Sequence, residues 1–235
     1  VNDSALMPTV VIQDLFKRYN NNHDIPPAVN NLNLTLFDSH VTCLLGHNGA
    51  GKTSTISMLT GLFPPTSGDC MIHGKSITND LLAVRESMGV CPQHDVLFDE
   101  LTVSEHLHFF ERIKGVEASV DGIKARAEEV GLGSFLRTRS SALSGGNKRK
   151  LSVAIALCGN PNFVLLDEPT TGMSPDARRA TWELIRREKR DKTILLTTHF
   201  MDEAEVLADR IAIMKEGELQ CCGSNLYLKD KFGLG

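Results

Sequence analysis

The chain carries a phosphate-binding loop of the pattern G-x-x-x-x-G-K-T at residues 46–53. A short apolar run, residues 41–45, precedes the loop, and apolar side chains at helical spacing, Ile56, Leu59 and Phe63, follow it. Such a loop binds phosphate through backbone N–H groups only when a strand leads into it and a helix leaves it. We therefore expect a buried strand at 41–45 and a helix at 53–63, and disfavour the alternative of a plain glycine turn.

Strand-like and helix-like patterns alternate through most of the chain. This alternation predicts right-handed crossovers and a mostly parallel sheet, hence an α/β fold. The expected strands are residues 10–16, 32–36, 163–166, 193–197 and 211–214, and the expected helices are 177–189 and 201–208.

The middle of the chain has a different, purely helical pattern. Thr102 and Glu105 have the spacing of a capping box, which predicts a helix from there to about residue 114. A second helix carries Ile123 and Ala127 on one face and is ended by Gly131. With a third helix after residue 144, we expect residues 98–158 to form a helical lobe inserted into the α/β core.

Composition excludes some classes of protein. The 235 residues suffice for one domain, or for a core with a lobe. A net charge of −4 argues against a general nucleic-acid binder. No apolar run approaches the roughly 18 residues that span a bilayer, so membrane spans would have to come from another segment. Six cysteines without C-x-x-C spacing or a secretory leader predict reduced, mostly buried thiols in the cytosol.

Two carboxylates follow the apolar run at residues 163–166, namely Asp167 and Glu168. Ligands of open parallel sheets bind at the carboxyl ends of the strands, where these two side chains are expected. Asp167 suits the coordination shell of Mg²⁺, and Glu168 can polarise a water as general base. The alternative is a solvated acidic turn after a core strand.

A second glycine stretch, residues 143–147, resembles half of a binding site. Ser144, Gly145 and Gly146 lead into a helix, so their backbone N–H groups lie at a helix N-terminus, which attracts phosphate. Because the chain already has a complete phosphate loop, the additional half-site predicts a nucleotide shared between two copies of the fold.

These stretches together resemble the nucleotide-binding domain of ABC transporters over essentially the whole chain. In the order of the family, they are the Walker A loop at 46–53, Gln93 within 91–95, the signature at 143–147, the Walker B strand ending in Asp167 and Glu168, and His199. Residues 46–49, 91–94, 148–152 and 223–229 are similar to subfamily A, whose full-length members move lipids.

The resemblance implies a fold in more detail. It is a P-loop NTPase fold, RecA-like, with a mostly parallel sheet core, an N-terminal antiparallel β subdomain and an inserted all-helical subdomain. Residues 1–235 would form one domain, with the catalytic core and β subdomain at 1–97 and 159–222. The helical signature subdomain would be 98–158, and 223–235 a C-terminal tail.

The resemblance also implies ligands and residue roles, with ATP and Mg²⁺ as the ligands. Contacts to ATP would come from Tyr19, Gly46, His47, Asn48, Gly49, Ala50, Gly51, Lys52, Thr53, Ser54 and Gln93, and from the signature residues Ser144, Gly145, Gly146 and Asn147. The Mg²⁺ ligands would be Thr53, Gln93 and Asp167, and the catalytic residues Glu168, His199 and Gln93. Without the resemblance, Tyr19 is read as an exposed hairpin tyrosine, His199 as a turn histidine and Gln93 as a polar turn residue.

The implied function is ATP hydrolysis that drives an ABC transporter, with a lipid or another hydrophobic molecule as cargo. The partners would be a second nucleotide-binding domain and the transmembrane domains, at the cytoplasmic face of a membrane, and no nucleic acid. A non-transport ABC-type ATPase, associated with ribosomes or DNA, is the alternative. A kinase or GTPase leaves the signature unexplained and would need an Asn-Lys-x-Asp run that the chain lacks.

Two further stretches carry expectations of their own. Ser174 stands where the family usually has Asp; it can still cap a helix with Pro175 and Asp176 in the first turn, but a charge facing the second head is lost. We hypothesise altered coupling between the two sites, or one slow site. The run of three cations at 148–150 is interpreted as a solvated helix face rather than a nucleic-acid patch.

Overall fold

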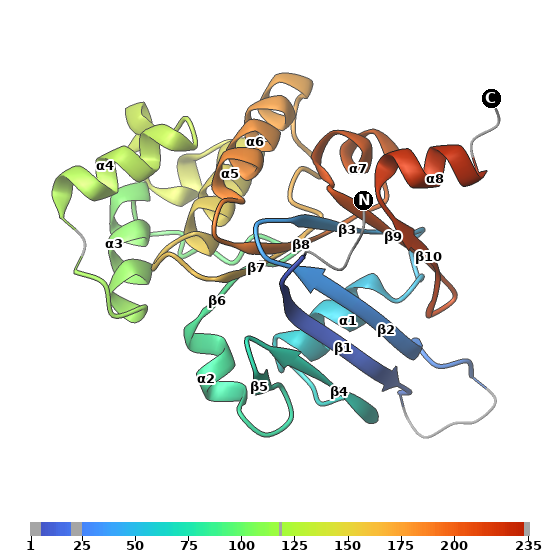
Figure 1. Ribbon diagram of the computed structural model, residues 1–235. Coiled ribbons are helices and arrows are strands. Elements are labelled where there is room, and N and C mark those ends of the chain that lie inside the picture. The colour runs from blue at the N-terminus through green and yellow to red at the C-terminus, as the bar shows by residue number, and fades with distance from the viewer. Residues whose placement is uncertain (1–5, 20–24, 118, 233–235) are drawn as a thin grey trace.

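The computed structural model of the chain describes residues 6–19, 25–117 and 119–232. Residues 1–5 and 233–235, at the two ends of the expected domain, lie outside the described residues. Two sheets and a group of helices make up the described part (Figure 1).

The first sheet is antiparallel and has the strand order β2-β1-β4-β5. It confirms the expected N-terminal β subdomain, although only its first two strands were anticipated from sequence. The strands are β1 (Pro8–Lys17), β2 (Val29–Phe37), β4 (Ser67–Ile72) and β5 (Lys75–Ser76).

The second sheet has six strands in the order β10-β9-β3-β8-β7-β6. Neighbours from β9 to β6 pair in parallel, and only β10 joins its neighbour β9 in antiparallel fashion. The mostly parallel core is thereby confirmed. The strands are β3 (Val41–Leu45), β6 (Met88–Cys91), β7 (Phe163–Asp167), β8 (Thr193–Thr198), β9 (Arg210–Lys215) and β10 (Glu218–Gly223).

The parallel sheet is buried on both faces, as its continuous apolar strands require. On β7, Val164 and Leu166 belong to one core cluster, whereas Phe163 and Leu165 belong to the other. The first cluster joins the sheet to α5 (Gly145–Ala156), α6 (Pro175–Glu188) and α7 (Met201–Leu207), and the second joins it to α1 (Lys52–Leu59) and the antiparallel sheet.

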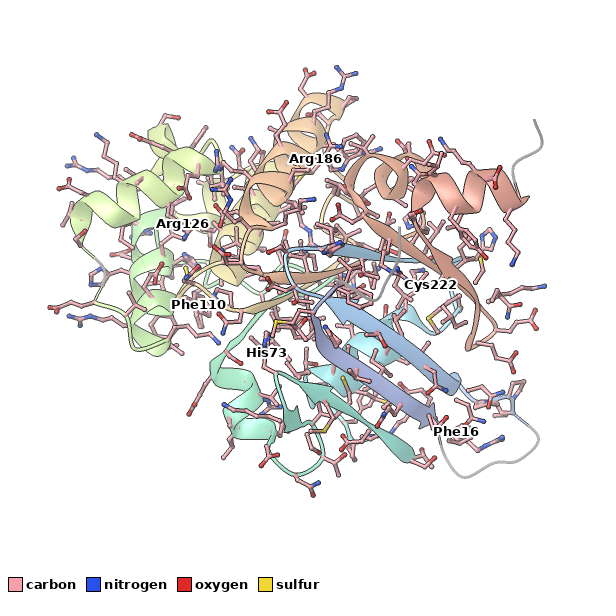
Figure 2. The ribbon with its side chains drawn as sticks, viewed as in Figure 1. Phe16, His73, Phe110, Arg126, Arg186 and Cys222 are labelled. Carbon is pink, nitrogen blue, oxygen red and sulfur yellow. The ribbon has the colours of Figure 1, made fainter. Side chains whose placement is uncertain are left out.

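The helical lobe lies to one side of the molecule, away from the antiparallel sheet (Figure 1). It contains α3 (Val103–Ile113) and α4 (Val120–Glu129), and it leads into α5. Figure 2 places Phe110 of α3 and Arg126 of α4 on this side and Phe16 of β1 at the opposite end. The remaining helices are α2 (Leu81–Glu86) and α8 (Asn225–Phe232).

Local signals account for several helix ends. The capping box at Thr102 is present, with the Thr102 hydroxyl accepting from Glu105 N and the Glu105 carboxylate accepting from Thr102 N. The helix after the phosphate loop ends at Leu59 rather than at Phe63. Gly61, at φ 68°, turns the chain there, and Gly61 N and Leu62 N bond back to the last turn of the helix.

The expected burial of the thiols is confirmed for Cys43, Cys70, Cys91 and Cys158, whereas the remaining two cysteines are half-buried. Burial raises the pKa of Cys91 and of Cys158 to about 12, so neither thiol ionises readily at neutral pH. Within the described ranges, no helix combines the length and the apolar character that crossing a membrane requires.

Candidate functional site

The phosphate loop connects β3 to α1 and is wedged against two other segments. A Cβ atom on Gly46 would lie 2.6 Å from the carbonyl oxygen of Met214 in β9. On Gly51, which has φ 103°, it would lie 2.4 Å from the carbonyl oxygen of Ala28. Both positions therefore require glycine because the fold leaves no room for a side chain there.

Lys52 is the first residue of α1, and its ammonium folds back over the loop. Its Nζ donates to the carbonyl oxygens of Gly46, at 2.6 Å, and His47, at 3.1 Å. Burial lowers the pKa of Lys52, while the nearby carboxylates of Glu168 and Asp167 act in the opposite direction. The loop thus holds one buried cation close to both predicted carboxylates.

The loop borders a hollow of about 390 Å³, a size found for small-molecule sites. The hollow brings together seven of the predicted ATP-binding residues and two of the predicted catalytic residues, Gln93 and Glu168, whereas Gly46, His47 and Ala50 of the loop do not line it. Ala28, from the segment before β2, was not anticipated, because no local pattern marks it. The lining residues are Ala28, Asn48, Gly49, Gly51, Lys52, Thr53, Ser54, Gln93 and Glu168.

Asp167 is the last residue of β7 and is buried opposite Thr197 of β8. The Thr197 hydroxyl donates to Asp167 Oδ1. Burial raises the pKa of Asp167 above its ordinary value; the Thr197 hydrogen bond opposes the rise, and the neighbouring Glu168 adds to it. Thr197 was missed from sequence, although its place just before Thr198 and His199 at a strand end could have suggested it.

Glu168 follows β7 in a left-handed conformation, with φ 47°, that directs its side chain toward two donors. His199 Nδ1 lies 3.1 Å from Glu168 Oε1, and the Thr171 hydroxyl donates to Oε2, also at 3.1 Å. A carboxylate only accepts, so the hydrogen bond to Glu168 is donated by an N–H at Nδ1 of the histidine. The structure thus brings together two residues that are 31 positions apart and that the sequence predicted to act together.

Tyr19 lies beside the start of α1 but does not line the hollow. Its ring packs edge-on against Phe63 at 5.6 Å, and its hydroxyl lies 3.1 Å from Ser54 Oγ. The side chain is 43% exposed, and Lys17 Nζ lies 5.5 Å from the centre of the ring. Its predicted stacking on adenine stays a prediction.

The signature residues lie at the start of α5, in a hollow that shares no lining residue with the first. Ser144 caps the helix by accepting from Asn147 N at 3.3 Å. Among the described residues, a Cβ atom on Gly145 or Gly146 would meet nothing within 4 Å apart from its chain neighbours and the backbone of its own helix, and neither glycine has a positive φ. No contact in the described part of the chain therefore requires glycine there, in contrast to Gly46 and Gly51.

The interpretation of residues 148–150 as a solvated face is wrong for Arg149. Successive helical residues point about 100° apart, so three adjacent cations cannot share one face. Lys148 and Lys150 are half-buried, whereas Arg149 points inward with a side chain only 4% exposed. Its guanidinium bonds to the loops that follow β6 and β7.

Ser174 caps α6 as expected. Its hydroxyl accepts from Ala177 N at 3.4 Å, Pro175 is the first helical residue, and Asp176 lies in the first turn. Ser174 borders the same hollow as the signature residues Ser144, Gly146 and Asn147. The position where the resemblance leads us to expect an aspartate therefore lies beside the half-site.

The match to known families decides which proteins this chain belongs with. Residues 29–171, more than half of the chain, match the ABC transporter family. The chain is an ATP-binding cassette of the ABC transporter family. This membership excludes the kinase or GTPase alternative and agrees with the order of the motifs.

Relatives and solved structures agree with this assignment. The cassette is 52% identical over 232 residues to human phospholipid-transporting ATPase ABCA3, covering 98% of the chain but 14% of that protein. It is 50% identical to rat ATP-binding cassette sub-family A member 2, over 97% of the chain and 9% of that protein. The resemblance to subfamily A is confirmed, and the chain spans only a small part of these relatives.

Solved structures show the same fold. An ATP-binding subunit of an ABC transporter superposes with a TM-score of 0.86 at 27% identity, covering 96% of this chain and 94% of that one. A bacterial Atm1-family ABC exporter with ATP bound superposes with a TM-score of 0.85 at 23% identity, covering 97% of this chain and 40% of the exporter. The cassette therefore has the expected P-loop NTPase architecture.

Proposed function

We propose that this cassette is the ATP-hydrolysing motor domain of a membrane transporter that moves a lipid or another hydrophobic molecule. The observation that carries the proposal is the first hollow, where Lys52 and the phosphate loop face Glu168 with its partner His199. About half of the residues are shared with a relative named as a phospholipid-transporting ATPase, which supports the choice of cargo.

The residues at the hollow suit Mg²⁺ as well as ATP. Mg²⁺ binds oxygen ligands; the Thr53 hydroxyl lines the hollow, and the buried carboxylate of Asp167, next to Glu168 in the chain, would supply a second ligand. Gln93, on the loop after β6, lines the hollow and adds an amide oxygen. We propose these three side chains as the protein's share of the metal site, where the ion would offset the negative charge of the phosphates.

Hydrolysis needs a base beside the terminal phosphate. Glu168 Oε1 and Oε2 each accept one hydrogen bond, from His199 and Thr171, which limits the rotation of the carboxylate. A carboxylate held in this way can take the proton of an attacking water. His199 Nδ1 faces Glu168, so a contact to the γ-phosphate would be donated by an N–H at Nε2.

The second head would complete the site. The open space at Gly145 and Gly146 suits close approach of another molecule to the backbone N–H groups at the start of α5. We propose that this half-site receives the γ-phosphate of an ATP held by the phosphate loop of a partner cassette, in a head-to-tail dimer. A dimeric ATP-binding cassette bound to ADP and phosphate shares the fold, with a TM-score of 0.82.

The transporter assignment extends beyond this chain. The chain covers 14% of its phospholipid-transporting relative, so the transmembrane domains would belong to the rest of the protein. The cassette would then work at the cytoplasmic face of that membrane, without nucleic acid. Its likeness to subfamily A favours this assignment over a ribosome- or DNA-associated ATPase.

The decisive test is the substitution Glu168→Gln in the full-length protein. The amide keeps the shape of the side chain but cannot accept a proton from water, so we expect ATP binding to persist and turnover to fall at least about 100-fold. ATP should remain trapped between the heads, measured as retention of labelled nucleotide. Turnover near the wild-type rate would show that Glu168 is not the base.

A further inference from the structure

Arg149 uses every hydrogen-bond donor of its guanidinium inside the protein. An arginine side chain has five N–H donors in a rigid planar fork. Here Nε donates to Pro169 O, Nη1 to Pro92 O and Asp95 Oδ1, and Nη2 to Asp167 O and Glu168 O, over 2.5–3.2 Å. Four of the five acceptors are backbone carbonyls, so a bound ligand is not what this arginine contacts.

The acceptors come from two loops of the nucleotide site. Asp167, Glu168 and Pro169 are consecutive and place the Glu168 side chain in the first hollow. Pro92 and Asp95 flank Gln93, which lines the same hollow. Arg149 thus binds the Pro92 carbonyl and the Asp95 side chain on either side of Gln93, and the backbone around Glu168, while lining neither hollow itself.

A second contact ties the Gln93 loop to the same helix. The Ser152 hydroxyl donates to Asp95 Oδ1 at 2.8 Å, so Arg149 and Ser152 share one carboxylate oxygen. Residues three apart on a helix lie on the same face, which makes this pair a two-point attachment of α5 to the loop.

The other end of this linkage is the half-site. Ser144, the cap of α5, lies five positions before Arg149, within the first turns of the same helix. A helix moves as a rigid rod over so short a distance, so a shift of its N-terminus displaces the guanidinium as well. The guanidinium then carries the movement to both loops, because its five bonds fix its orientation.

We propose that Arg149 is a positioning residue that couples the two half-sites of one chain. Engagement of the signature by a partner's ATP would set the positions of Gln93 and Glu168 in this chain's own site through Arg149. The inference rests on the proposed function, since it requires a nucleotide held at the signature by a second head.

The experiment replaces Arg149 with lysine in the full-length protein. Lysine keeps the charge but offers three donors on one nitrogen, so it cannot span two loops. We expect turnover to fall about tenfold to 100-fold, the range for misplaced catalytic groups, with ATP affinity within about twofold of wild type. The same substitution in a Glu168→Gln background should still trap ATP, because closure on the signature precedes the coupling.

Two further variants distinguish loss of the Asp95 contact from a general effect of substitution in the helical lobe. Ser152→Ala removes the second contact to Asp95, together with a hydrogen bond to the Lys148 carbonyl within the helix, and should lower turnover by about threefold, a small part of a typical catalytic contribution. Arg126→Lys is the matched control: Arg126 lies in the same lobe (Figure 2) and pairs with Glu129 and Glu188, away from both hollows, so turnover should not change.

The outcomes separate the two proposals. Turnover of Arg149→Lys and of Ser152→Ala at the wild-type rate would overturn the coupling role. Loss of ATP binding or trapping in Arg149→Lys, together with normal turnover in Ser152→Ala, would also overturn it and leave only a structural role. Failure of Glu168→Gln by itself to trap ATP would instead contradict the proposed function.

Discussion

Asp167 is a buried carboxyl whose negative charge would serve the proposed Mg²⁺ site and has no such role in the nucleotide-free protein. It lies at the end of β7, and burial raises the pKa of its carboxyl in the nucleotide-free protein. The protonated form is therefore favoured on folding. The contribution of this carboxyl to the free energy of unfolding is complete below pH 3.8, the ordinary pKa of aspartate. It is lost as the pH rises through the raised pKa of the folded protein.

Asp167→Asn should consequently stabilise the nucleotide-free protein at neutral pH. Asparagine can still accept from the Thr197 hydroxyl but has no charge to bury. We expect a melting temperature higher by about 2–4 °C near pH 7.5, which corresponds to roughly 1 kcal/mol in a domain of this size. The gain should shrink as the pH falls toward the ordinary value of 3.8, because the raised pKa favours the protonated form of the wild-type carboxyl there.

Thermal unfolding without nucleotide or Mg²⁺ measures this effect. The same substitution at the exposed Asp230 on α8 is the matched control and should produce no such pH-dependent gain. A gain of equal size at both pH values, or a loss near neutrality, would contradict the proposed cause.

At the scale of elements, substitution of Ser174 allows the stability of α6 and the function of its N-terminal end to be tested independently. The hydroxyl caps α6, and aspartate is as good a cap as serine. Ser174→Asp should leave the free energy of unfolding within about 0.5 kcal/mol of wild type. Any change in activity then reflects the surface that the residue presents beside the signature, not the folding of α6.

We expect Ser174→Asp to raise the turnover rate or its cooperativity in ATP. A coupling change of about 1 kcal/mol would appear as roughly a fivefold difference. Turnover as a function of ATP concentration in the full-length protein is the measurement. Ser119→Asp, at the cap of α4, makes the same exchange elsewhere in the chain and serves as the control. Identical rates and Hill coefficients would remove the hypothesis that this position alters coupling.

Element boundaries show how far local patterns reach. The strand β3 matches the expected residues 41–45 because a short apolar run buried on both faces leaves little ambiguity. The strand β6 was not anticipated; it has four residues, including Gly89. A Cβ atom on Gly89 would overlap the carbonyl oxygen of Ala156 in α5, so the reason for this glycine is a contact distant in sequence.

At the scale of the whole molecule, Gly51 and Gly145 differ in why a glycine is needed: one for folding, the other for assembly with a second head. Gly51 is required by contacts within the chain, whereas Gly145 has open space around it. Gly145→Ala should therefore fold normally, since the added methyl group meets no described atom outside its own helix and chain neighbours. If a partner's phosphate occupies that space, turnover should fall at least about tenfold while ATP binding stays within about twofold.

Gly51→Ala is the matched comparison and should lose ATP binding itself, because the loop would have to move away from Ala28. Nucleotide binding and turnover of both variants, measured in the full-length protein, test the difference. Normal turnover in Gly145→Ala would show that nothing approaches the start of α5 during the cycle.

The sequence by itself determined the features that depend on neighbouring residues. The phosphate loop and the caps at Thr102, Ser144 and Ser174 follow from patterns within a few positions, because backbone geometry and near hydrogen bonds make them. The mostly parallel order of the core follows from the alternation of strands and helices along the chain.

Only the tertiary structure decided how the site is held together. Thr197 bonds to Asp167 across 30 positions, and Arg149 reaches Pro92 across 57. Burial of Arg149 depends on two loops converging on one face of α5, and no local pattern distinguishes that face from a solvated one. The sequence gives the charge of a residue, but the packing of the folded chain determines its partners. Packing brings together segments that are far apart along the chain.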